Sequence, residues 1–161
     1  MENKDQSFPI FITGSVRTGT SIVNRALMKG AKLPGYLEGC FINMLGDFLI
    51  AIDENYDRRT IQCIDPRIMI SRFKRKELKN DLLKWFRDQY EAKSGLSGTW
   101  VDKTADAGLL KSMPYVLKMW PNAKFIVMKR RSIENVNSRI KKFPYRDFKN
   151  HCTGWAPVSY T

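Results

Sequence analysis

The sequence contains few of the side chains from which metal sites and disulfide frameworks are built. It has one histidine, His151, and three cysteines, none of them in a C-x-x-C pair. A zinc site needs a cluster of such ligands, and an odd number of scattered cysteines does not indicate a disulfide scaffold. We therefore expect no metal site, reduced thiols in a cytoplasmic protein, and a structural or exposed role for His151.

Long apolar runs are absent as well. The best candidate, residues 41–52, is shorter than the roughly 20 residues that a membrane-spanning helix needs, and it contains Asp47. Residues 1–6 lack the basic-then-apolar order of a signal peptide. These features predict a protein without a membrane-spanning segment.

Acidic residues are the minority among the charged side chains. The 28 Lys and Arg residues outnumber the 16 Asp and Glu residues and give a net charge of +12. Such a charge favours anionic partners, whether a nucleotide, a sulfated or phosphorylated acceptor, or nucleic acid, without choosing among them. The basic run at residues 72–76 is similar to a nucleic-acid patch, but it precedes an amphipathic helix, and we interpret it as a solvated helix start.

Apolar periodicity predicts strands that alternate with helices. Strands are expected at residues 8–13, 99–102 and 124–128. Helices are expected at residues 21–29, 38–52, 77–92, 107–119 (with a break or a second start at Pro114) and 133–141. Residues 53–59 are expected to form a charged loop. This order predicts an α/β fold with a mostly parallel sheet flanked by helices, in a single domain over residues 1–161.

A glycine-rich segment lies between the first expected strand and helix. Residues 14–21 match the P-loop spacing G-x-x-x-x-G-K-[ST] except that Thr20 replaces the lysine, and Arg17 lies inside the loop. Backbone N–H groups at such a helix start still bind an anion. Without its lysine, however, an ATP or GTP hydrolase loses the charge that holds the β- and γ-phosphates, so we expect a different phosphate-like ligand.

Two further cations follow other strands. Lys103 and Arg130 lie just past the strands expected at 99–102 and 124–128, as Arg17 lies just past the first strand. Ligands of parallel sheets bind beyond the carboxyl ends of the strands. We therefore expect the three cations to converge on one site.

These segments together resemble sulfotransferases that use 3′-phosphoadenosine 5′-phosphosulfate (PAPS). Residues 14–21 resemble the family's 5′-phosphosulfate loop, especially in the carbohydrate and tyrosylprotein types. Residues 124–138 resemble its 3′-phosphate motif, in which a strand ends in an arginine and a serine follows eight positions later, here Arg130 and Ser138. Residues 100–104 are similar to its short strand ending in lysine, here Lys103. The resemblance implies a P-loop-containing nucleotide-binding fold.

The resemblance also implies residue roles. Arg17 and Lys103 would stabilise charge during transfer, and Arg130 and Ser138 would bind the 3′-phosphate of PAPS. The 5′-phosphosulfate would be bound by loop residues Gly14, Ser15, Arg17, Thr18, Gly19, Thr20 and Ser21. The acceptor would be a hydroxyl compound, a saccharide or another small alcohol.

Glu38 is the candidate general base. Family members of the tyrosylprotein type place a glutamate a little over twenty residues after the loop arginine, where Glu38 lies. Its apolar sequence neighbours would favour its protonated form. The other interpretation is that Glu38 caps the following helix.

Two other functional classes remain open. One is a kinase or nucleotide hydrolase with a degenerate loop, for which Asp102 is the only candidate Mg²⁺ ligand. The other is a basic nucleic-acid-binding protein, which only the charge supports. Because similar enzymes are usually longer, the length of the chain leaves open that the domain is incomplete at its C-terminus.

Overall fold

A computed structural model describes residues 8–153 and 155–156 of the chain. Residues 1–6, in which we expected no signal peptide, lie outside the described residues. A single domain over residues 1–161 stays a prediction. No helix in the described part of the chain is both long and apolar enough to cross a membrane.

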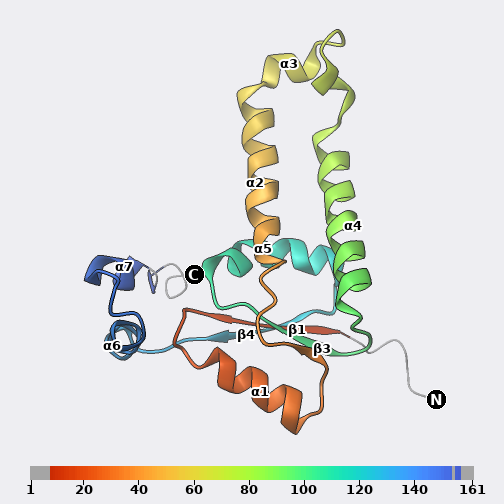
Figure 1. Cartoon of the computed structure of the whole chain (residues 1–161). Coiled ribbons are helices and arrows are strands. Elements are labelled where there is room, and N and C mark those ends of the chain that lie inside the picture. Colours follow the sequence, from red (N-terminus) through yellow and green to blue (C-terminus); the bar gives the residue numbers. More distant parts are fainter. Residues whose placement is uncertain (1–7, 154, 157–161) are drawn as a thin grey trace, which may run out of the picture.

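The centre of the fold is a sheet of four parallel strands in the order β2-β3-β1-β4 (Figure 1). The strands are β1 (Pro9–Gly14), β2 (Gly35–Tyr36), β3 (Trp100–Lys103) and β4 (Lys124–Met128). The predicted α/β fold with a parallel sheet is confirmed. The two-residue strand β2 was not predicted, because a segment so short carries no alternating pattern.

Helices cover both faces of the sheet, and the core lies on one of them. Helix α1 (Thr20–Gly30) packs below the sheet in Figure 1, and α5 (Ala107–Met119) lies above it. Phe11 of the central strand is fully buried and contacts the rings of Trp100, Trp120 and Phe125. Burying a side chain of this size contributes about 1.5–3 kcal/mol, so the aromatic cluster fixes the sheet against the upper helices.

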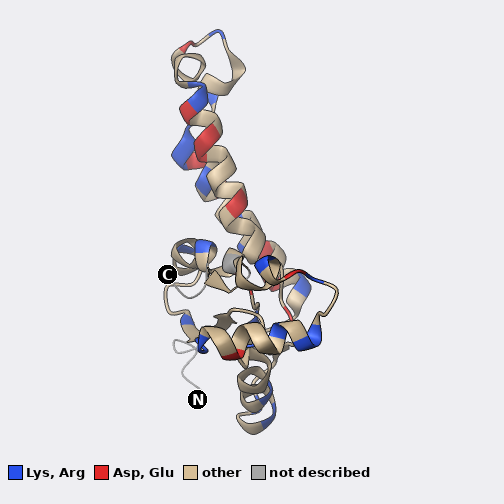
Figure 2. Ribbon diagram, turned by 90° about the vertical axis from the view of Figure 1, so that its left-hand side faces the viewer, with Lys and Arg blue, Asp and Glu red and all other residues tan. Residues whose placement is uncertain are grey.

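Two long helices stand away from the sheet as an arm (Figures 1 and 2). They are α2 (Asn43–Arg58) and α4 (Arg75–Ser94), joined at the far end by α3 (Thr60–Ile64) and the 3₁₀ helix η2 (Met69–Arg72). Their lower turns pack on α5, where Gly46 approaches so closely that an added Cβ would lie 2.9 Å from the Cβ of Lys111. The arm is therefore continuous with the core at one end and exposed at the other.

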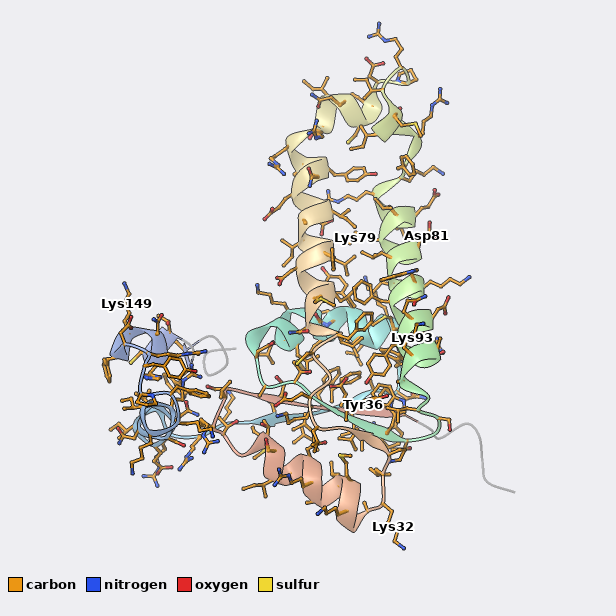
Figure 3. All side chains as sticks on the ribbon, in the orientation of Figure 1. Lys32, Tyr36, Lys79, Asp81, Lys93 and Lys149 are labelled. Atoms are coloured by element: carbon orange, nitrogen blue, oxygen red, sulfur yellow. The ribbon has the colours of Figure 1, made fainter. Side chains whose placement is uncertain are left out.

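The prediction of a charged loop at residues 53–59 is wrong, because α2 continues to Arg58. The Asp53 carboxylate accepts hydrogen bonds from Lys79 at 2.6 Å and Arg75 at 2.7 Å across the arm. These partners, Lys79 first, hold the pKa of Asp53 below its usual range. In Figure 3 Lys79 points from α4 toward α2. Pairing between the helices keeps polar residues helical, which sequence periodicity does not report.

Helix α5 also differs from its prediction, since it runs through Pro114 without a break. Asp106 caps its start by accepting hydrogen bonds from the N–H groups of Gly108 at 2.7 Å and Leu109 at 3.2 Å. Inside the helix, the Ser112 hydroxyl accepts a bond from the Gly46 N–H at 2.9 Å. The cap and the packing of α2 hold the helix together despite the proline.

The last described helices lie beside the carboxyl end of the sheet. Helix α6 (Ser132–Lys142) follows β4, and α7 (Phe148–Thr153), which was not predicted, packs on α6 (Figure 1). His151 of α7 is 1% exposed. It is therefore buried rather than exposed, and its structural role stays a prediction.

Candidate active site

The loop between β1 and α1 is tightly constrained. An added Cβ on Gly14 would lie 2.5 Å from the carbonyl oxygen of Met128 and 2.7 Å from the Thr18 hydroxyl. Arg17 has a φ of 75°, and Gly19, with a φ of 98°, precedes the first turn of α1. Only glycine leaves room for the neighbouring strand β4 at position 14, so the chain turns there at once.

Two hydroxyl residues of the loop point inward. The Thr18 hydroxyl and its N–H group both donate to the Ser15 carbonyl, at 2.7 and 3.1 Å. Ser15 is 2% exposed and Thr18 is 8% exposed. These side chains therefore shape the loop, and a direct contact of either with a ligand stays a prediction.

The first turn of α1 is arranged to attract an anion. No side chain caps its N-terminus, and the turn contains no acidic residue. The free N–H groups and the helix dipole make such a terminus positive. Thr20 and Ser21 line the adjacent cavity.

Lys103 lies at the end of β3 with its side chain only 4% exposed. Its Nζ lies 3.4 Å from the Ser21 hydroxyl and forms an ion pair with the Glu38 carboxylate. A buried ammonium is costly unless it is paired, which explains why Glu38 is held against it. Lys103 thus joins the loop to the candidate base.

Both sequence-based expectations for the surroundings of Glu38 are wrong. Its side chain is 56% exposed and paired with Lys103 rather than set in apolar surroundings. It caps no helix either, because α2 begins only at Asn43. The neighbouring Gly39 N–H donates to the Lys103 carbonyl at 3.0 Å, which places this segment along the end of β3.

The other two cations lie together across the loop. Arg17 donates from Nε to the Ser138 hydroxyl at 3.2 Å, and Arg130 donates from Nη1 to the Arg17 carbonyl at 3.2 Å. The side chain of Arg17 therefore lies with Ser138 and Arg130, whereas the contacts of Lys103 are to Ser21 and Glu38. Arg130 also pairs with Glu134 at 3.3 Å.

A single cavity of about 530 Å³ brings these groups together. The loop, the three cations and the candidate base all contribute to its lining. The lining residues are Val16, Arg17, Gly19, Thr20, Ser21, Ile22, Glu38, Lys103, Ala105, Arg130 and Phe143. The convergence that the strand ends indicated is present in the structure. Ser138 is not one of the lining residues, but its hydroxyl contacts Arg17, which is.

Asn135 was missed by the sequence analysis. It is fully buried, and its side chain donates to the Val16 carbonyl at 3.0 Å and accepts from the Ser15 hydroxyl at 3.4 Å. Asn135 precedes Ser138 by three positions on α6, so both side chains lie on one helix face toward the loop. That i, i+3 spacing of polar residues is the pattern that could have identified it.

Asp102 does not serve the cavity. It is 1% exposed and accepts hydrogen bonds from Tyr90 at 2.7 Å and Thr104 at 3.3 Å. Burial raises the pKa of Asp102 above its usual range. Within the described residues, no group of three or more His, Cys, Asp or Glu side chains could hold a metal ion. Asp102, the candidate Mg²⁺ ligand of a kinase or nucleotide hydrolase, is therefore packed into the core.

A family model describing the sulfotransferase family matches residues 9–156. The chain belongs to the sulfotransferase family. No curated protein matches the chain. The match confirms the resemblance found in the sequence and the P-loop-like α/β fold, and it supports sulfuryl transfer as the general activity.

The close approach at Gly14 predicts that Gly14→Ala destabilises the fold. A Cβ there would press on a backbone carbonyl that cannot move freely, so the free energy of unfolding should fall by about 1–3 kcal/mol in urea titrations. Gly30→Ala is the matched control, because nothing lies within 4 Å of a Cβ added at that position. Equal stability of the two variants would show that the loop does not depend on this contact.

Proposed function

We propose that the protein is a PAPS-dependent sulfotransferase that transfers the sulfuryl group to the hydroxyl of a saccharide or other small alcohol. The observation that carries the proposal is the single cavity in which the loop, Lys103, Arg130 and Glu38 meet. Cations from three strand ends and one carboxylate suit a donor with several negative charges and an acceptor that must lose a proton.

The cations lie in two groups, Lys103 on one side and Arg17 with Arg130 on the other, and these suit the two ends of the donor. The loop residues Gly14 to Ser21, with Lys103, would hold the 5′-phosphosulfate at the start of α1. Arg130 and Ser138 would hold the 3′-phosphate. Arg17 lies on the Ser138 side, 3.2 Å from its hydroxyl, so it can bridge the two ends of the cavity.

The donor supplies the sulfuryl group, and the protein supplies charge and a proton acceptor. The acceptor oxygen forms a bond to sulfur while the bond from sulfur to the 5′-phosphate oxygen breaks. Glu38 takes the hydroxyl proton. Lys103, which contacts Glu38 and Ser21, would neutralise the charge that develops on the leaving oxygen.

A second cavity suits the acceptor. It has a volume of about 300 Å³ and shares Glu38 with the donor cavity. Its other lining residues are mostly aromatic or hydrogen-bonding, namely Tyr36, Gly39, Phe41, Trp85, Gln89, Tyr90, Lys93 and Ser94. Figure 3 labels Tyr36 near the sheet and Lys93 on the lower part of α4. Aromatic walls with a few polar groups are typical of small-ligand pockets and support a ring-containing alcohol.

The donor assignment predicts a preference for a 3′-phosphate. 3′-Phosphoadenosine 5′-phosphate should bind at least about tenfold more tightly than AMP in calorimetric titrations, which is about 1.4 kcal/mol. Arg130→Ala should remove most of this difference, because it removes a charge that we propose holds the 3′-phosphate.

Arg131→Ala is the matched control, since this neighbouring arginine has a side chain that is 89% exposed. It should leave the preference unchanged. Equal affinities for the two nucleotides in the unmodified protein would contradict the assignment of the 3′-phosphate site.

If Glu38 is the general base, Glu38→Gln should lower the rate of transfer but not the affinity for the donor. This change keeps the shape and removes the proton acceptor, so transfer of labelled sulfate from PAPS should fall by about 10²-fold or more. Donor affinity should stay within a few-fold. Glu54→Gln, on an exposed turn of α2, is the control and should transfer sulfate normally. Full activity of Glu38→Gln would place the proton acceptor elsewhere.

A further inference from the structure

The far end of the arm, residues 58–76, is strongly basic. We call this segment the arm tip. It contains seven Lys and Arg residues and one acidic residue, Asp65, so that 19 of 161 residues carry half of the net charge of +12. Neither proposed cavity includes any of these residues. The basic run at residues 72–76 is part of this tip rather than only a solvated helix start.

Several cations of the arm tip have no acidic partner. Arg67 pairs with Asp65, Lys74 with Glu77, and Arg75 with Asp53 and Asp57. Among the described residues, the remaining four form no ion pair, namely Arg58, Arg59, Arg72 and Lys76. Their charge is available to an external anion.

The same tip exposes large apolar side chains. Ile61 and Ile64 of α3 are each 77% exposed, and Met69 of η2 is 70% exposed. Phe73 and Ile68 add further exposed apolar surface. The tip projects away from the sheet in both views, so no other part of the described chain covers it (Figures 1 and 2).

An apolar groove continues from the tip between the arm helices. It has a volume of about 560 Å³, and Ile70 and Phe73 connect it to the tip. Its other lining residues are mostly apolar, namely Phe48, Ala51, Ile52, Asn55, Tyr56, Leu78 and Leu82. The apolar surface is therefore larger than the exposed tip alone.

We propose that the arm tip docks the protein on an anionic membrane surface. Unpaired Lys and Arg beside exposed Ile, Met and Phe is the composition of segments that lie in the headgroup region of a bilayer. Each cation near such a surface is attracted by anionic lipid, and the apolar side chains gain by leaving water. Nucleic acid would use the cations but would leave the isoleucines of α3 in water, so the observations favour a membrane. The proposal does not depend on the proposed transferase activity.

Vesicle flotation of the full chain tests the proposal. Vesicles of phosphatidylcholine with a third of phosphatidylglycerol should bind at least about tenfold more protein than vesicles of pure phosphatidylcholine. Ile61→Ser with Ile64→Ser should reduce that binding by about tenfold or more, and Arg59→Gln with Lys76→Gln should do the same. All four side chains are solvent-facing or only partly buried, so both double variants should fold normally.

Two matched controls use exposed residues away from the arm. Ile133→Ser removes an isoleucine that is 74% exposed on α6, and Lys29→Gln with Lys149→Gln removes two cations from α1 and α7. Figure 3 shows Lys149 far from the arm. These variants should float like the unmodified protein.

Three outcomes would overturn the proposal. The first is equal binding to anionic and neutral vesicles. The second is binding that survives both double variants at the tip. The third is the absence of vesicle binding in a protein that binds duplex nucleic acid through Arg59 and Lys76, which would assign the tip to nucleic acid.

Discussion

The parallel register of β1 between β3 and β4 is the constraint on which the site depends. It sets Ile12 opposite Lys103 and Gly14 opposite Met128, so that all three strands end at the same edge of the sheet. The glycine loop then turns into α1 beside Lys103, and Arg130 follows β4 on the other side. The buried aromatic cluster around Phe11 packs the strands together, so the backbone at the strand ends that carry these charges is held by the core.

The need to pair a nearly buried cation at the sheet edge determines the arrangement of the candidate site. Lys103 is nearly buried, and the Glu38 carboxylate and the Ser21 hydroxyl satisfy it. The same contacts bring the candidate base to the boundary between the two cavities that we propose for the donor and the acceptor. The charge that would stabilise a leaving oxygen and the group that would accept a proton are therefore positioned by one interaction.

The sequence predicted what local patterns encode. The glycine spacing located the loop, and cations after apolar strands indicated Lys103 and Arg130, because parallel strands end at a common edge. It did not predict the helical state of residues 53–58, which depends on ion pairs between Asp53 and a helix more than twenty residues away. The sequence also did not predict the surroundings of Glu38 or the hydrogen bonds of Asn135 to the loop, because both depend on contacts between distant segments.

We propose that one cavity binds both phosphates of the donor nucleotide. A crystal structure with 3′-phosphoadenosine 5′-phosphate tests it most directly. The 5′-phosphate should lie within about 3 Å of the backbone N–H groups at the start of α1 and of Lys103 Nζ, and the 3′-phosphate should contact Arg130 and Ser138. A nucleotide bound outside this cavity, or one whose 3′-phosphate lies in solvent, would contradict it.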